Sequence, residues 1–252
     1  MTDLSKPLPL GLSRRNWPVL IVIVAAVIAV AAPADHFVSA FAQGWPDPFA
    51  TFFARITDLG LSDWILIPSL VLLLVSGGLA LAMRRGPVMP RLALLQMTSI
   101  WAFIFIGVGL PGLVSNLIKR LIGRARPVVF DADGPFAFHS FANNWQFESF
   151  PSGHATTSFA FAMVVAFINP KWFWPAIVVA ILIGVSRVAV GMHYPTDVVG
   201  GMVLGVLGAY LVRLFFASRG WGFTRLPDGG VQPRPLSAVH RLLRPRRQPA
   251  AR

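Results

Sequence analysis

The chain has 252 residues, of which 55% are hydrophobic and 13% are charged, and its net charge is +12. Soluble domains carry about 25% charged residues, so this composition favours a membrane protein. The basic residues lie between long apolar segments and in the tail, as they do in membrane proteins, and we expect no nucleic-acid partner. Because the sequence has no cysteine, disulfides, thiolate catalysis and Cys-ligated metals are excluded.

Six apolar segments predict an all-α, polytopic fold with six transmembrane helices. Several are nearer to 15 residues than to the ~20 of a full span, so we expect their helices to extend into the flanking residues. The first segment follows basic residues, as a signal peptide would, but Pro33 directly after Ala31-Ala32 makes a poor cleavage site. We interpret it as a retained span. The segments run roughly over residues 17–33, 63–83, 92–114, 155–168, 172–187 and 196–216.

The basic residues between the segments predict the orientation, because cytoplasmic loops are enriched in Lys and Arg. Six spans place both termini on the same side as the connections after the second and fourth segments. The basic residues on that side are Lys6, Arg14, Arg15, Arg84, Arg85, Arg91, Lys171, Arg219, Arg225, Arg234, Arg241, Arg244, Arg246, Arg247 and Arg252. We therefore predict a cytoplasmic N-terminus (1–16), a membrane domain (17–216) and an Arg-rich cytoplasmic tail (217–252). The composition and compact layout suit a bacterial inner membrane.

The segment between the third and fourth spans, residues 115–154, departs from this rule, because it is basic yet falls on the outer side. Its basic residues are Lys119, Arg120, Arg124 and Arg126, and Arg187 ends the fifth span on the same side. Basic groups placed against the topology need another cause, and a bound anion is the natural one, because ionisable groups at a membrane edge usually mark function.

Two further outer segments carry aromatic residues. Residues 44–60 fit a short amphipathic helix at the membrane interface, or an ordinary loop with aromatic anchors. Residues 131–149, with Asp131, Asp133 and Glu148 among aromatic side chains, predict an irregular loop that can line a substrate entrance.

A first motif joins Lys119 to Arg126-Pro127. If the third helix continues outward, positions seven apart lie on one face, and Pro127 then marks its end. Lys supplies a point charge, and Arg supplies a planar fork that fits phosphate oxygens two at a time. The alternative is a cluster of side chains that extend to the membrane surface from a helix end.

A second motif is Pro151-Ser152-Gly153-His154, directly before the fourth apolar segment. Ser152 is a good N-cap, and Gly153 lets the backbone approach a ligand closely. The free N–H groups and positive dipole end of a helix N-terminus suit a phosphate. His154 falls at the edge of such a site, although a single histidine there is also common as a structural residue.

A third motif runs from Ser186-Arg187 through His193 to Asp197. Pro195 fits the first turn of the sixth helix, which also contains Asp197. Asp197 can accept the Nδ1–H of His193 and stabilise its imidazolium, or it can simply compensate the helix dipole. All three motifs fall at outer ends of spans, so one site can collect three cations, two histidines and an aspartate.

Together the motifs resemble the three-part signature of the type-2 phosphatidic acid phosphatase superfamily. The resemblance covers roughly residues 90–215. This group includes membrane lipid phosphatases, soluble bacterial acid phosphatases and vanadium haloperoxidases, and the apolar segments favour the membrane branch. The resemblance implies that His193 attacks phosphorus, that Asp197 orients His193, and that His154 first protonates the leaving oxygen and then activates water.

The resemblance also identifies the phosphate-binding residues and indicates whether a metal or cofactor is needed. These residues are Lys119, Arg126, Ser152, Gly153 and Arg187. The three cations take the place of the Mg²⁺ that many phosphoryl-transfer enzymes use, so we predict no metal and no cofactor.

The resemblance and the predicted topology together imply that the substrate is a lipid phosphate or diphosphate on the outer side, and we expect undecaprenyl diphosphate first. Phosphatidic acid, phosphatidylglycerol phosphate and lipid A phosphate are the alternatives, as are a lipid phosphotransferase, a haloperoxidase and a non-enzymatic membrane scaffold. Gly201 and Gly205 predict close helix packing, either within the bundle or in a homo-oligomer. The tail from Arg241 either binds anionic lipid headgroups or is a solvated segment.

Overall fold

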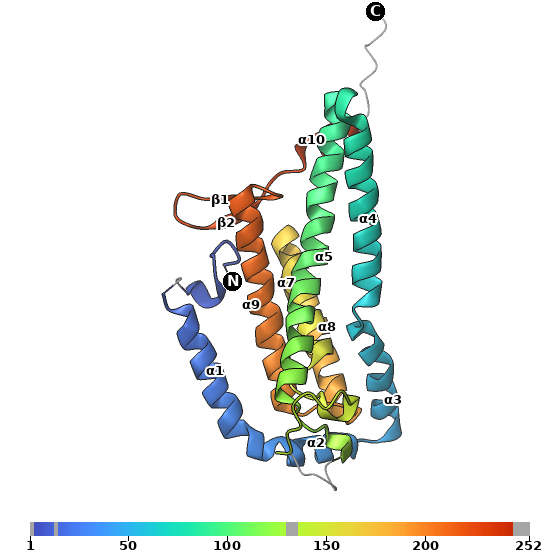
Figure 1. The fold of residues 1–252 in the computed structure, drawn as a ribbon, viewed down its shortest axis with the longest axis vertical. Coiled ribbons are helices and arrows are strands. Elements are labelled where there is room, and N and C mark those ends of the chain that lie inside the picture. Colours follow the sequence, from blue (N-terminus) through green and yellow to red (C-terminus); the bar gives the residue numbers. More distant parts are fainter. Residues whose placement is uncertain (1–2, 13–14, 130–135, 244–252) are drawn as a thin grey trace, which may run out of the picture.

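The computed structural model describes residues 3–12, 15–129 and 136–243, and its fold is mostly helical (Figure 1). Within these residues, five helical stretches are long and apolar enough to cross a membrane: Pro18–Gln43, Asp47–Arg85, Val88–Ile122, Pro170–Ala189 and Pro195–Arg219. The predicted multi-pass helical fold is confirmed in this form. The remaining predicted span is a helix of only 16 residues, α7 (Gly153–Ile168).

Helix α7 forms the centre of the bundle, which explains how it can be short. It packs against α5 (Val88–Ile122), α8 (Phe173–Ala189) and α9 (Pro195–Arg219), so protein rather than lipid surrounds most of it. Its large apolar side chains Phe159, Met163 and Phe167 are buried.

Two glycines set the distance between α9 and α7. A Cβ atom on Gly201 would lie 2.4 Å from the carbonyl oxygen of Ser152, and one on Gly205 would lie 2.4 Å from that of Thr156. Only a residue without a side chain fits such contacts. The close packing predicted for these glycines therefore lies within the bundle.

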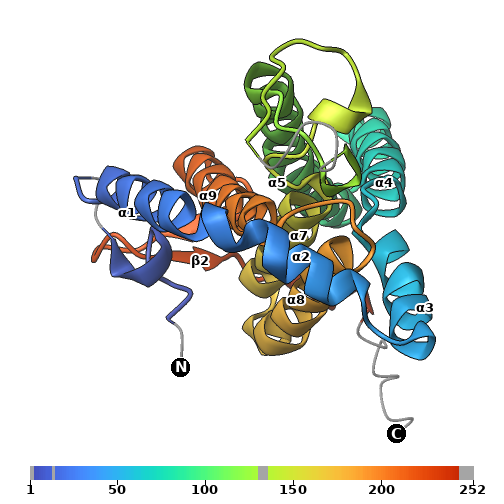
Figure 2. The same cartoon turned by 90° about the horizontal axis from the view of Figure 1, so that it is seen from below.

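The helices before α5 flank this bundle. Helix α4 (Asp63–Ala82) pairs with α5, whereas α1 (Trp17–Ala31) contacts α9 but is largely exposed, with bare apolar side chains such as Val22 and Val30. Figure 2 shows α2 (Asp35–Gln43) lying across the ends of the bundle, where it packs on α8 and α9. Helix α3 (Asp47–Ile56) follows it and packs on α8, so residues 44–60 contain a helix rather than an ordinary loop.

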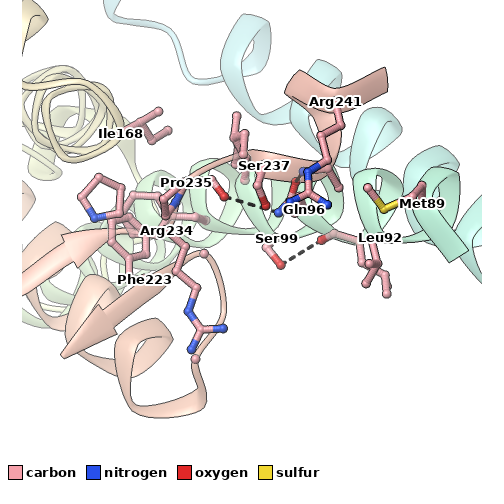
Figure 3. Close-up of a pocket in the computed structure, with 18 residues that line it drawn as sticks. Met89, Leu92, Gln96, Ser99, Ile168, Phe223, Arg234, Pro235, Ser237 and Arg241 are labelled. Atoms are coloured by element: carbon pink, nitrogen blue, oxygen red, sulfur yellow. Dashed lines mark hydrogen bonds between the residues drawn. The ribbon is translucent and has the colours of Figure 1, made fainter. Parts of the chain in front are cut away.

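The opposite end of the bundle carries a hairpin of β1 (Phe223–Arg225) and β2 (Val231–Pro233), followed by α10 (Ser237–Leu243). Gln96 of α5 accepts hydrogen bonds from the first N–H groups of α10, which fixes that helix against α5 (Figure 3). The chain as far as Leu243 is therefore folded, whereas most of the tail from Arg241, whose lipid-binding or solvated character stays a prediction, lies outside the described residues. The basic residues predicted at Arg14, Arg244, Arg246, Arg247 and Arg252 lie outside the described residues, as do Asp131 and Asp133.

The N-terminal segment is held at the same end as the hairpin. Buried Arg213 of α9 donates to the carbonyl oxygens of Leu4 and Lys6, and Val231 donates to that of Ser5. The described parts of both terminal regions therefore meet at the end of the bundle opposite α2. Short 3₁₀ helices complete the chain: Pro9–Gly11, Ala32–Ala34, Thr57–Gly60, Met83–Arg85, Pro127–Val129, Trp145–Phe147 and Pro170–Trp172.

Candidate functional site

The three sequence motifs meet at the α2 end of the bundle. The first lies where α5 ends, the second where α7 begins, and the third at the junction between α8 and α9. Long-range contacts among α5, α7, α8 and α9 hold these helix ends together. The structure therefore gathers the predicted residues in one place.

Lys119 occupies the last turn of α5, where it is buried. Gly123 ends the helix with φ +64°, and its N–H donates to the carbonyl of Lys119. This is the left-handed cap that glycine adopts at helix ends. A Cβ at Gly123 would also lie 2.1 Å from the carbonyl oxygen of His139, so the turn depends on glycine.

Arg126 lies beyond the end of α5, so the prediction that it shares a helix face with Lys119 is wrong. The helix stops at Ile122, because the chain turns at Gly123 to run beside the outer loop. The Arg126 side chain donates to the carbonyl oxygen of Glu148 at 3.3 Å and lies over the ring of Trp145. Burial lowers the pKa of the Arg126 guanidinium, although its charge is still close enough to interact with Lys119.

Ser152 is the N-cap of α7, as predicted, with its hydroxyl oxygen facing the N–H of Ala155 at 3.5 Å. The next residue, Gly153, faces Lys119: a Cβ added at Gly153 would lie 3.3 Å from the lysine Nζ. The ammonium group therefore lies directly at the positive end of the α7 dipole. A cation placed there favours an anion between the two.

Arg187 and His154 lie against the segment that precedes α4. Arg187 is buried in the last turn of α8, and its Nη1 donates to the hydroxyl of Thr57. A Cβ on Gly60 of the same segment would lie 2.7 Å from the His154 ring. The Nε groups of Arg126 and Arg187 are buried without a hydrogen-bond partner among the described residues, so the protein leaves these donors unsatisfied.

His193 is 1% exposed, and its Nδ1 lies 3.7 Å from Oδ2 of Asp197. This is an ion-pair distance rather than the predicted hydrogen bond. The reason is that Oδ2 already accepts from the Ser149 hydroxyl at 2.6 Å and the Tyr194 N–H at 2.8 Å. Catalytic hydrogen bonds are often long without substrate and tighten in its presence.

Burial lowers the pKa of His193 to about 4, and the nearby Asp197 carboxylate only partly opposes this effect. The folded protein therefore holds His193 neutral at physiological pH, where an unperturbed histidine with a pKa of about 6.5 is partly protonated. A neutral imidazole keeps a lone pair on one ring nitrogen, as a nucleophile requires.

The pH at which activity falls on the acidic side should therefore be unusually low. Protonation removes the nucleophilic lone pair, so kcat/KM should fall as pH decreases through about 4 rather than through about 6.5. The measurement is a kcat/KM profile from pH 3.5 to pH 8 on the solubilised enzyme, divided by the ionisation of the substrate phosphate measured by ³¹P NMR. A residual acid pKa near 6.5 would contradict a neutral, buried His193.

Four residues that the motif analysis did not assign to the site surround Asp197: Asp35, Arg124, Ser149 and Thr196. Arg124 Nη1 donates to Asp197 Oδ1 at 2.7 Å, and its Nη2 donates to Asp35 Oδ2 at 2.8 Å. The two carboxylates hold the pKa of the Arg124 guanidinium above its ordinary value, despite the opposing effect of burial. In the sequence, Arg124 stood out only as a basic residue on the unexpected side.

A cavity of about 390 Å³ reaches the site from the side of α4 and α5. Lys119, Gly153 and His154 form its polar end, and the rest combines apolar residues that include Leu61 and Leu113 with the polar residues Ser62, Asn116 and Thr157. Leu61 and Leu113 are also exposed on the outside of the bundle. The cavity therefore joins a polar end to an apolar, exposed flank.

Among the described residues, no group of three or more His, Asp or Glu side chains is placed to hold a metal ion. The described part of the predicted outer loop, residues 136–149, is irregular apart from one 3₁₀ turn, Trp145–Phe147. It pairs with the segment that follows α5 through Arg124 and Phe138.

Comparison with known proteins agrees with the motif analysis. The PAP2 superfamily matches residues 100–221. A lipid A 1-phosphatase of Rhizobium johnstonii is 38% identical over 186 residues, which cover 73% of this chain and 75% of that protein. The undecaprenyl-diphosphatase BcrC of Bacillus subtilis is 33% identical over 132 residues, which cover 48% and 66% of the two chains.

A solved structure is similar to this chain in both fold and sequence. The crystal structure of a transmembrane PAP2 type phosphatidylglycerolphosphate phosphatase from Bacillus subtilis is 28% identical, with a TM-score of 0.50. The match covers 79% of this chain and 94% of that one. All three relatives are named as lipid phosphatases or diphosphatases, the class of enzyme that the motifs predicted. The chain belongs to the PAP2 superfamily.

Proposed function

We propose that the protein hydrolyses the phosphate of a membrane lipid through a phosphohistidine on His193, without a metal ion. The observation that carries this proposal is the burial of His193 beside Asp197, at a helix end where Lys119, Arg126 and Arg187 lie close enough for their charges to interact. Three cations and the α7 N-terminus match the charge of a transferring phosphoryl group.

The reaction has two steps. In the first, Nε2 of neutral His193 attacks phosphorus, the bond from phosphorus to the leaving oxygen breaks, and protonated His154 gives its proton to that oxygen. In the second, neutral His154 takes a proton from water as the water attacks phosphorus, and the phosphorus–nitrogen bond breaks. The three cations and the Gly153 N–H hold the non-reacting oxygens, with Ser152 supporting that turn. Asp197 stabilises the charge that develops on His193.

We also propose six spans, with α7 as the short fourth span and the site on the periplasmic side of a bacterial inner membrane. The end of the bundle that holds both terminal regions carries Lys6, Arg84, Arg219 and Arg225, which suits the cytoplasm. The domain boundaries at residues 16 and 217 follow from this topology. Six spans place both termini on one side, the basic residues assign that side to the cytoplasm, and the α2 end then faces outward.

The leading substrate is a lipid A 1-phosphate, and undecaprenyl diphosphate is the second candidate. The order differs from the one predicted from sequence because the lipid A 1-phosphatase of Rhizobium johnstonii matches over more of both chains. The cavity supports either lipid, since its polar end lies at Lys119 and His154 and its apolar flank is exposed.

A phosphate-release assay in detergent tests the proposal. Lipid A 1-phosphate, undecaprenyl diphosphate, phosphatidylglycerol phosphate and phosphatidic acid are each offered at equal mole fraction, with and without an acceptor lipid. We expect release of free phosphate, fastest with lipid A 1-phosphate and independent of the acceptor. No release from any of the four lipids would overturn the proposal, and phosphate transfer only to the acceptor would identify a phosphotransferase.

Removal of divalent metal ions should leave this activity unchanged. The cations proposed to neutralise the phosphoryl group are side chains, so a chelator has nothing essential to remove. The rate after dialysis against EDTA should stay within about twofold of the untreated rate, because no Lewis acid takes part. A loss of activity that Mg²⁺ restores would contradict the site as proposed.

A further inference from the structure

Asp197 belongs to a buried polar cluster that begins on α2, far from the motifs in sequence. Asp35, the first residue of α2, accepts from Arg124 Nη2 at 2.8 Å, from the Thr196 N–H at 3.1 Å and from the Thr196 hydroxyl. Arg124 donates in turn to Asp197 at 2.7 Å and to Thr196 at 2.8 Å. One guanidinium therefore bridges two carboxylates.

All members of this cluster are withdrawn from solvent. Asp35 is 1% exposed, Arg124 4%, Thr196 3%, and Asp197 is fully buried. Screening by water is therefore weak, and the balance of charge within the cluster matters. Two carboxylates and one guanidinium leave one negative charge in excess within the cluster. Lys119 and Arg126 also interact with the charge of Asp197, and His193, 3.7 Å from Asp197, is the neighbour that becomes cationic in the proposed reaction.

We propose that Asp35 is a positioning residue for the reaction at His193: it shares the Arg124 guanidinium, so that the Asp197 carboxylate remains available to the cationic phosphohistidine. This inference rests on the proposed function. Without Asp35, the charge of Arg124 would neutralise that of Asp197. The cationic ring of phosphorylated His193 would then lie beside a neutral ion pair and lose its electrostatic stabilisation. Arg124 with Asp35 thus acts through Asp197 and does not touch the substrate.

A second contact ties α2 to the same loop. A Cβ on Gly191 would lie 2.8 Å from Oε1 of Gln43, at the other end of α2. The helix therefore lies against both sides of His193, at Gly191 in the loop and at Thr196 in the first turn of α9. If the only role of this contact were to attach α2 to the His193 loop, apolar side chains would do so at a lower desolvation cost than a buried cluster of three charges. Asp35 lies outside residues 100–221, which match the PAP2 superfamily, so the positioning group comes from a flanking segment.

The test is the kinetics of Asp35→Asn. Loss of the negative charge of Asp35 should slow phosphorylation of His193, because that step makes the imidazole ring cationic. It should not slow hydrolysis of the phosphohistidine, because that step returns the ring to its neutral form. We expect kcat to fall about 10- to 100-fold, as for other residues that orient a reacting group through hydrogen bonds. KM should change by less than about threefold. Rapid-quench labelling with ³²P-labelled lipid should show a slower burst and less phosphohistidine.

Control variants separate this role from a structural one. Asp47→Asn makes the same change at the exposed start of α3 and should alter kcat by less than about twofold. The double variant Asp35→Asn with Arg124→Gln restores the single negative charge, so its kcat should exceed that of Asp35→Asn by at least about threefold. If the role of Asp35 were only structural, the double variant should have a lower kcat than Asp35→Asn, since Arg124→Gln removes further contacts. Arg124→Lys keeps the positive charge but lacks the two Nη groups that bridge Asp35 and Asp197, so its kcat should fall with KM unchanged.

The outcomes distinguish the two proposals. Phosphate release by the wild type with none from His193→Ala supports the proposed function, whatever Asp35 does. Given that result, phosphohistidine formation at the wild-type rate in Asp35→Asn or in Arg124→Lys overturns the positioning role alone. A kcat of the double variant below that of Asp35→Asn overturns it as well. If Asp35→Asn does not fold, as judged by thermal unfolding in detergent, Arg124→Lys decides the question. Absence of wild-type release overturns the proposed function and the inference with it.

Discussion

Replacement of His193 by alanine should reduce phosphate release by about 10⁴-fold or more, because the proposed mechanism transfers the phosphoryl group to His193. The residue is 1% exposed, so alanine also leaves a cavity beside Asp197. His193→Gln, which keeps most of the volume, should be equally inactive. The measurement is free phosphate released from the best lipid substrate in detergent, together with ³²P labelling of the protein.

His240→Ala is the matched control for this experiment, because it removes a histidine from α10 at the opposite end of the bundle. Its activity should equal that of the wild type. Thermal unfolding in detergent establishes that each variant is folded. Turnover by a folded His193→Ala protein at a rate near that of the wild type would refute the nucleophile assignment.

Replacement of Asp197 by asparagine should have two separate effects. The variant loses the negative charge that stabilises a cationic His193, so kcat should fall by about 10³- to 10⁴-fold with little change in KM. It should also be less stable, because Asp197 accepts from Arg124, Ser149 and Tyr194, and an amide turns an NH₂ group toward some of these donors. The loss should be about 1–3 kcal/mol of unfolding free energy.

Asp63→Asn provides the control for the simpler role of Asp197, compensation of a helix dipole. Asp63 is exposed in the first turn of α4, so its replacement removes a dipole contact and little else, worth about 0.3–1 kcal/mol. The measurements are kcat, KM and thermal unfolding of both variants in detergent. If Asp197→Asn changes them no more than Asp63→Asn does, Asp197 is a dipole residue and the proposed mechanism fails.

The sequence allowed the motif residues to be predicted because each motif is local. Ser152 and Gly153 cap α7 as their types and order indicate, and Asp197 falls in the first turn of α9 after Pro195. The motifs also predicted the family and the class of enzyme, which the relatives confirm. The roles of the individual side chains remain predictions for the experiments above to test.

Long-range pairing explains what was not predicted. Arg124 and Asp35 are 89 positions apart, and nothing local marks either as the partner of the other. The third helix continues outward from its apolar segment, as expected, but its end at Ile122 was not predicted, because it depends on the close approach of the outer loop to Gly123. The folding of the tail onto Gln96 depends on backbone groups of α10, which every sequence has.

The short length of α7 has a consequence for where the chemistry takes place. Sixteen residues rise about 24 Å, which is less than the ~30 Å hydrocarbon thickness of a bilayer, whereas its neighbour α9 has 25 residues. The N-terminus of so short a helix need not reach the membrane surface, and the cavity lined by Gly153 and His154 can then lie below the lipid headgroups. A phosphate on a flexible, membrane-anchored stem would have to be lowered to that depth while its hydrocarbon part stays in the leaflet. The depth of the site would then select amphiphiles by the reach of their headgroups.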